Sequence, residues 1–113
     1  MKIITDKISV EELKKMADKM FGNLVKGVVD IEKEVMAVNG ELHADEQALL
    51  LENNSKQENL WGINIYLEKI DQDFIEFDSV INIRPSQQNR SRGVDNLEIR
   101  EKIIEIVNKL IEK

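Results

Sequence analysis

The sequence predicts an α+β fold, in which an antiparallel sheet of about four strands packs against an N-terminal and a C-terminal helix. Three observations carry this prediction: a helix-start signal near each end, alternation of apolar and polar residues between them, and one short turn signal. A length of 113 residues suits a single domain over residues 1–113. A hydrophobic fraction of 42% and a charged fraction of 34% are typical of a globular chain.

A first helix is expected from about Val10 to about Phe21. Ser9 is followed three residues later by Glu12, which is a capping box that satisfies free backbone N–H groups at a helix start. Gly22 can take the left-handed conformation that ends a helix. The apolar residues before this helix predict a short strand: Ile3, Ile4 and Ile8.

The next segment, residues 24–38, is rich in valine and is expected to be a strand that bends at Glu32–Glu34. Asn39-Gly40 is a typical hairpin turn, so residues 41–44 are expected to form the returning strand. Residues 45–52 contain good helix formers, but their place after a hairpin favours a continuing strand.

A meander is expected to follow. Asn53, Asn54 and Ser55 predict a turn, and Ser55 with Glu58 is suited to cap a single helical turn before Trp61. Residues 63–67 and 74–81 each alternate apolar and polar side chains, which predicts two more strands joined across residues 68–73.

The last helix has the strongest pattern. Asp95 and Glu98 form a second capping box before an apolar stripe at helical spacing. Ile104 and Ile111 widen this stripe, which indicates deep burial or a contact in a homodimer. The residues of the stripe are Ile99, Ile103, Ile106, Val107 and Leu110.

Composition argues against several classes of chemistry. The chain has no cysteine and one histidine, so we expect no disulfide, thiolate nucleophile, metal centre or cofactor. A net charge of -6 argues against a nucleic-acid partner, because most of the surface would repel a phosphate backbone. No apolar run reaches the roughly 20 residues that span a bilayer, and no signal peptide is evident, so a cytoplasmic protein is expected.

Four short runs resemble signatures of one family. The resemblance is to a family of short prokaryotic proteins catalogued only as a domain of unknown function, and it extends over nearly the whole chain. It implies no reaction, cofactor or site. The runs are Phe21-Gly22-Asn23-Leu24-Val25, Gly40-Glu41-Leu42-His43-Ala44-Asp45, Leu60-Trp61-Gly62-Ile63-Asn64 and Ile81-Asn82-Ile83-Arg84-Pro85-Ser86-Gln87.

The best pointer to a site is the segment Arg84–Arg92, here called the arginine loop. It holds three of the four arginines and the only proline, and it contains no acid. Guanidinium groups bind phosphate or carboxylate through paired, charge-assisted hydrogen bonds, so the loop predicts a site for a small anionic ligand. The proposed ligand-binding residues are Arg84, Ser86, Asn89, Arg90, Ser91 and Arg92.

A purely structural use of these arginines is the alternative hypothesis. In that interpretation they form surface ion pairs with nearby carboxylates, which contribute about 0–1 kcal/mol each. The carboxylates in question are Asp71, Asp73, Glu76 and Asp78.

His43 and Asp45 suggest a second class of function. In a strand these residues would share a face, and Asp45 could then orient His43 as a general base, with Arg84 stabilising a developing anion. Trp61 beside Gly62 is compatible with a ligand wall, although a core position fits the same pattern better.

The leading interpretation is a binding or interaction module for a small anion or a protein partner. The alternatives are a metal-independent enzyme that uses His43 and Asp45, and a regulatory partner that docks through an apolar patch containing Ile104 and Ile111.

Overall fold

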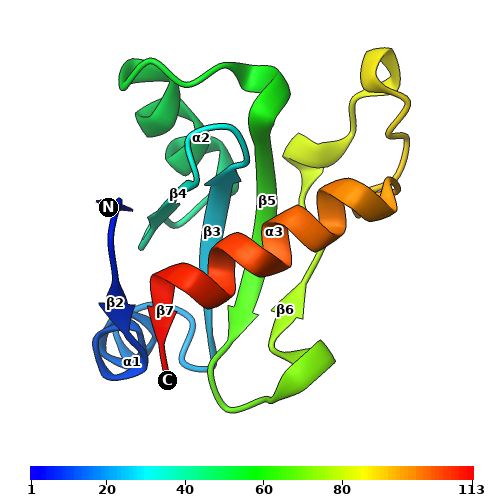
Figure 1. Cartoon of the computed structure of the whole chain (residues 1–113). Helices are drawn as coiled ribbons and strands as arrows, with labels where there is room; N and C mark the ends of the chain where they lie inside the picture. Colours follow the sequence, from blue (N-terminus) through cyan, green and yellow to red (C-terminus); the bar gives the residue numbers. More distant parts are fainter.

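The computed structural model describes residues 1–113 and has the α+β architecture that the sequence predicts (Figure 1). A five-stranded antiparallel sheet has the order β1-β4-β3-β5-β6, and β2 and β7 form a separate parallel pair. The helices are α1 (Val10–Asp18), α2 (His43–Glu52) and α3 (Leu97–Leu110). The strands are β1 (Lys2–Ile4), β2 (Ile8–Ser9), β3 (Leu24–Asp30), β4 (Val35–Val38), β5 (Leu60–Tyr66), β6 (Ile75–Glu76) and β7 (Ile111–Glu112).

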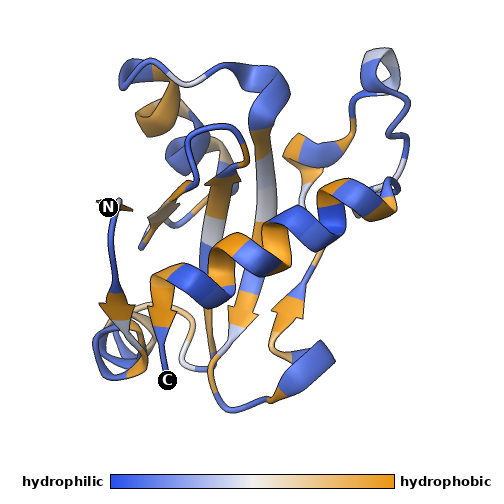
Figure 2. Cartoon of the chain, viewed as in Figure 1, coloured by the Kyte–Doolittle hydropathy of each residue, from blue (hydrophilic) through white to orange (hydrophobic).

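Helices cover both faces of the sheet. Along β3, Val29 belongs to a cluster of 19 buried residues that includes α1 and α3, whereas Val28 belongs to a smaller cluster with Leu50 of α2. This separation follows from the strand period, because neighbouring side chains point to opposite faces. Figure 2 shows the result as hydrophobic residues along the central strands and on successive turns of α3.

The first hairpin is formed at the predicted bend. Strands β3 and β4 pair from Gly27↔Val38 to Asp30↔Val35, so the chain reverses between Asp30 and Val35. The Asp30 carboxylate closes this turn by accepting the backbone N–H groups of Glu32 and Lys33 at 2.9 and 3.0 Å. Glu34 completes the turn in the left-handed region at φ 57°.

The predicted hairpin at Asn39-Gly40 is wrong. A type I′ hairpin needs positive φ at both central residues, and here only Asn39 has it, at 67°. The backbone N–H of Gly40 instead donates to the Glu46 carboxyl at 2.8 Å, and the chain turns into α2.

The strands predicted for residues 41–44 and 45–52 are therefore wrong as well. Residues 43–52 form α2, as their helix-forming side chains would favour. Leu50 is buried against the second face of the sheet, so tertiary packing selects the helix.

The terminal helices begin close to their predicted starts. The Glu12 N–H donates to Ser9 Oγ at 3.1 Å, which confirms the first cap, although α1 ends at Asp18. The cap of α3 is Asn96 rather than Asp95, because the Ile99 N–H donates to Asn96 Oδ1 at 3.1 Å. Most of the predicted α3 stripe is buried: Ile103, Ile106, Val107 and Leu110.

The later strands differ in length from their predictions. Strand β5 begins at Leu60, and β6 covers only residues 75–76 of the predicted 74–81. Residues 80–82 form a short 3-10 helix, η3, whose start is capped by the Ser79 hydroxyl accepting from the Ile81 N–H at 3.3 Å. The predicted single helical turn is present as η1 (Gln57–Asn59), but Ser55 donates to Asp30 at 2.6 Å instead of capping it.

The two isoleucines that widen the α3 stripe have different environments. Ile111 is 4% exposed in β7, so it does not contribute to an exposed patch as the sequence suggested. Ile104 is 38% exposed. None of the helices combines the length and the apolar character needed to cross a membrane.

Candidate functional site: the arginine loop

The arginine loop projects from the molecule between η3 and α3 (Figure 1, upper right). Its ends are joined by an antiparallel bridge, with the Arg84 N–H donating to the Asn89 carbonyl at 2.7 Å and the reverse bond at 3.1 Å. Between them, Pro85 begins the 3-10 helix η4 (Pro85–Gln87), and Gln88 reverses the chain at φ 61°. The loop is thus a closed turn with its own hydrogen bonds.

Arg84 fixes the loop to the start of β5. It is 8% exposed, and its Nη1 and Nη2 groups donate to the carbonyls of Gln57 and Leu60 at 2.5 and 2.6 Å. The guanidinium carbon lies 4.0 Å from the centroid of the Trp61 ring. Burial lowers the pKa of Arg84. Both terminal nitrogens of Arg84 therefore bind the backbone, while Nε is buried without a hydrogen-bond partner.

Two buried asparagines hold the rest of the loop. Asn89 Nδ2 donates to the carbonyls of Asn82 and Gly93 at 2.7 and 2.8 Å, and its Oδ1 accepts from the Asp95 N–H at 2.8 Å. Asn82 forms two bonds with the backbone of Gly62, through Oδ1 at 2.8 Å and Nδ2 at 3.0 Å. Sequence reasoning missed Asn82, because a single asparagine after an apolar run has no pattern that marks it as buried.

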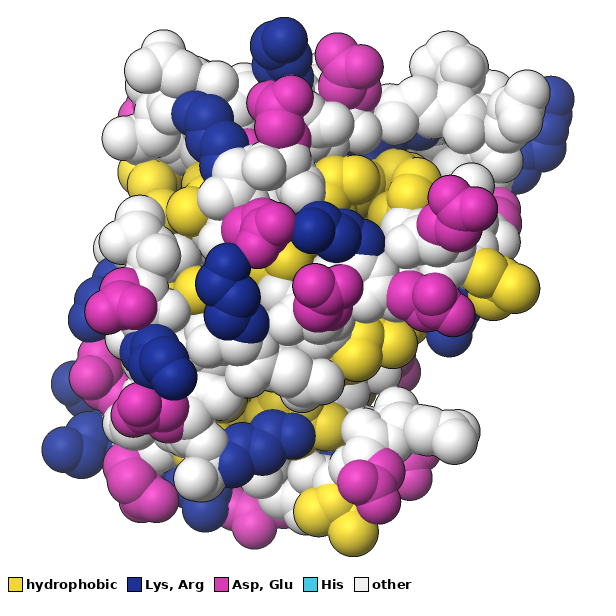
Figure 3. All heavy atoms as spheres, in the orientation of Figure 1, with side chains coloured by type: hydrophobic (Ala, Val, Ile, Leu, Met, Phe, Trp, Pro, Cys, Tyr) yellow, Lys and Arg dark blue, Asp and Glu magenta, His cyan; other side chains and the backbone are white.

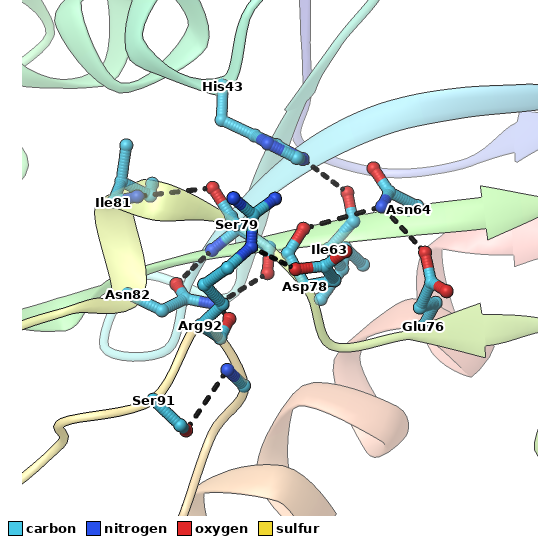
Figure 4. Close-up of polar contacts among 12 residues, drawn as sticks. His43, Ile63, Asn64, Glu76, Asp78, Ser79, Ile81, Asn82, Ser91 and Arg92 are labelled. Atoms are coloured by element: carbon cyan, nitrogen blue, oxygen red, sulfur yellow. Dashed lines mark hydrogen bonds and ion pairs between the residues drawn. The ribbon is translucent and has the colours of Figure 1, made fainter.

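Ser91 and Arg92 also have partners within the chain. The Ser91 hydroxyl donates to Asp95 Oδ1 at 2.7 Å and accepts from the Gly93 N–H at 3.1 Å. Arg92 Nε donates to Asp78 Oδ1 at 2.5 Å, which is the one ion pair of the arginine loop (Figure 4). Of the carboxylates proposed as structural partners for these arginines, Asp78 alone has that role.

Arg90 and Ser86 are the two proposed ligand-binding residues that remain free. Both are exposed, and neither side chain makes a hydrogen bond or ion pair within the chain. Between them, Gln87 Nε2 donates to the Glu58 carbonyl at 3.0 Å, which ties the tip of the loop to the turn before β5. The loop therefore presents one uncommitted guanidinium group from a braced backbone.

His43 lies at the start of α2 and points toward β5 (Figure 4). Its Nε2 is 2.8 Å from the Ile63 carbonyl, so this nitrogen carries the proton of the neutral ring. Burial lowers the pKa of His43, and the nearby charges of Asp78 and Arg92 act on it in opposite directions. The ring is thus neutral at pH 7.

The proposed catalytic set is not assembled. Asp45 is exposed, and because residues 43–52 are helical, His43 and Asp45 point to different sides of α2. Arg84 binds the carbonyls before β5 instead of facing the imidazole. No three His, Asp or Glu side chains are arranged to hold a metal ion.

A small cleft of about 240 Å³ lies between the arginine loop and the start of α3. Trp61 lines it and is 1% exposed, so this residue belongs to the core and also meets the cleft. The Trp61 Nε1–H has no hydrogen-bond partner. The other lining residues are Gln87, Gln88, Asn89, Asp95, Asn96 and Ile99.

Comparison with known proteins gives a family. Residues 2–110 match the family described as "Protein of unknown function (DUF5674)", and the chain belongs to that family, as the resemblance in its sequence indicated. No curated protein and no solved structure matched the chain.

Proposed function

We propose that this member of a family without an assigned activity is a binding module, and that the arginine loop contacts an anionic group of its ligand or partner through Arg90. The observation that supports this most directly is that the three arginines of the loop differ in their contacts. Arg84 and Arg92 are bound within the chain, whereas Arg90 is exposed and unpaired. The cytoplasmic location expected from the sequence is part of the same proposal.

The hydrogen bonds that hold the loop favour binding, because they fix its conformation before a ligand arrives. Ordering a flexible loop on binding costs conformational entropy, and a loop that is already held avoids that cost. Asn82 and Asn89 are both buried, with 0% and 3% of their surfaces exposed, and they hold a segment with little regular structure. Ser86 lies in η4 near the tip of the loop and has an exposed hydroxyl group that can donate to the same ligand.

Nuclear magnetic resonance titration of the labelled protein with inorganic phosphate, citrate and a polyglutamate peptide tests the proposal. We expect a saturable shift of the Arg90 side-chain resonance and of the Ser86–Arg92 amides. The variant Arg90→Gln should weaken binding of the active probe by about tenfold or more, since a charge-assisted hydrogen bond contributes roughly 1.5–3 kcal/mol.

Lys19→Gln is the matched control, because Lys19 is an exposed, unpaired cation at the end of α1 and loses the same charge. It should bind the probe as the wild type does. Equal shifts at Lys19 and Arg90, or shifts reproduced by sodium chloride at the same ionic strength, would show general screening and contradict the proposal.

A further inference from the structure

A second cleft, of about 620 Å³, lies away from the arginine loop between α3 and the segment Asp71–Phe77. Figure 3 shows hydrophobic side chains in the hollow beside α3. Arg100, Ile104 and Asn108 line it from the helix at spacings of four residues, which places them along one helical face. The volume is in the usual range of binding sites, roughly 300–1,000 Å³.

The cleft is lined by two aromatic rings, two isoleucines and two cations that lack carboxylate partners. The Arg100 guanidinium carbon lies 4.4 Å from the ring centroid of Phe77, and Lys113 Nζ lies 4.1 Å from that of Phe74. Neither cation makes an ion pair within the chain. Asp71 and Asp73 line the cleft from the short 3-10 helix η2 (Asp71–Asp73), which ends directly before Phe74. Its charges are therefore arranged in an order: Arg100 at one end, and the two carboxylates with Lys113 at the other.

The neighbouring edge of the sheet has backbone N–H and C=O groups that no other strand pairs with. Strand β6 is the edge strand, and the Tyr66 N–H donates to the Phe74 carbonyl at 2.9 Å. In an antiparallel pair the direction of the backbone groups alternates, so the N–H and C=O of Ile75 point away from β5. Farther along, the Ser79 N–H donates to the Arg92 carbonyl at 2.9 Å, and the chain covers its own edge there. The open edge is thus confined to the side of the cleft.

We propose that this cleft binds a short extended segment of a partner protein, which adds antiparallel to β6. The segment carries an acidic residue opposite Arg100, an apolar residue over Ile104 and a basic residue beside Asp71 and Asp73. Main-chain bonds to an exposed sheet edge combined with side-chain pockets are a general mode of peptide recognition. The site is separate from the arginine loop, and the proposal does not depend on the function proposed above.

The length of the cleft and the order of its charges define the length and the residue order of the bound segment. Arg100 and Asn108 are eight residues apart on α3, which is about 12 Å of helix and matches about four residues of extended chain. Because β6 runs from Ile75 toward Phe77, an antiparallel segment passes Arg100 first. The acidic residue therefore precedes the basic one, and alternate residues face the cleft.

Two synthetic peptides test this order: acetyl-Glu-Thr-Val-Thr-Lys-amide and its reverse, acetyl-Lys-Thr-Val-Thr-Glu-amide. Titration into the labelled full chain should give saturable shifts at Ile75, Arg100 and Ile104 with the first peptide. The reverse peptide should bind about tenfold more weakly, as should the first peptide with the variants Arg100→Gln and Ile104→Asp. Arg100→Lys should recover part of the affinity, because it keeps the charge.

Leu97→Asp is the control for Ile104→Asp, since Leu97 is 73% exposed on the same helix and does not line the cleft. It should bind the first peptide normally, and so should Arg90→Gln, which separates this site from the arginine loop. Absence of a saturable shift, or equal affinity for the two peptides, would overturn the proposal. A wild-type dimer that becomes a monomer with Ile104→Asp would overturn it too, because a second copy would then occupy the cleft.

Discussion

Glu46 places a carboxyl group in the interior, between α2 and the backbone of Gly40. The side chain is 0% exposed; Oε2 accepts the Gly40 N–H at 2.8 Å, and Oε1 has no partner. Burial raises the pKa of Glu46 to about 9, and the Gly40 hydrogen bond opposes this shift. At pH 7 the carboxyl group is therefore protonated in the folded protein.

This pKa makes the free energy of unfolding depend on pH. Glu46 titrates near 4.5 when unfolded and near 9 when folded, so between these values the folded state binds more protons. Stability should fall as pH rises through this window, by at most about 1.4 kcal/mol per pH unit from this group. Glu46→Gln should remove that loss, since an amide copies the neutral acid and can still accept from Gly40.

Urea unfolding of both proteins between about pH 5 and about pH 9 measures the difference. Glu52→Gln is the control, because Glu52 is exposed at the end of the same helix. If the wild type and Glu46→Gln lose stability in parallel over this range, Glu46 is not buried as a neutral acid.

Gly40 has a packing role that the sequence alone does not reveal. The sequence predicts a hairpin glycine at this position. In the structure the missing side chain makes room for Glu46, because a Cβ on residue 40 would lie 2.6 Å from Glu46 Cγ. Gly62 is similar, with a Cβ position 2.6 Å from the Ser79 side chain. Close contacts between distant residues have no local signature, which is why neither role could be predicted.

At the scale of elements, a helix or strand could be predicted where neighbouring residues determine it, and could not where packing against distant residues does. The cap at Ser9 and the apolar stripe of α3 are local signals, and both were predicted. The segment of residues 43–52 has helix formers, but its strand or helix state depends on packing of Leu50 against the sheet. For the arginine loop, the position was predicted, whereas the burial of Arg84 and Asn89 depends on residues far away in the sequence.

The loop's dependence on Asn89 can be measured. Asn89→Ala leaves the carbonyls of Asn82 and Gly93 and the N–H of Asp95 without their partner. We expect a loss of about 1–3 kcal/mol in the free energy of unfolding and a more mobile loop. Chemical denaturation compares it with Asn23→Ala, an exposed residue whose side chain makes no hydrogen bond. Equal stability of the two variants would contradict the role assigned to Asn89.

At the scale of the whole molecule, one acidic residue connects two elements that are far apart in the sequence. Glu34 lies in the β3–β4 turn and accepts from Lys102 and Lys109 of α3 at 2.8 and 2.7 Å. These two lysines lower the pKa of Glu34 to about 2. They connect the hairpin to the C-terminal helix across the sheet face that α3 covers.

The Glu34 contacts should stabilise the fold above its unfolded pKa of 4.5 and be lost as pH falls toward 2. Glu34→Gln should therefore be less stable than the wild type at neutral pH, and the difference should vanish near pH 2 and shrink in high salt. Thermal unfolding over this range measures it. Glu32→Gln, in the same turn without an ion pair, is expected to match the wild type. A Glu34→Gln difference that persists unchanged at pH 2 would argue against these ion pairs.

Backbone ¹⁵N relaxation of the free protein measures directly whether the arginine loop is held in place before it binds anything. The hydrogen bonds of Arg84, Asn82 and Asn89 predict order parameters for residues 84–92 close to those of β5, about 0.85. Values below about 0.6 across the arginine loop would mean that it is flexible before binding, and would contradict a braced site that presents Arg90.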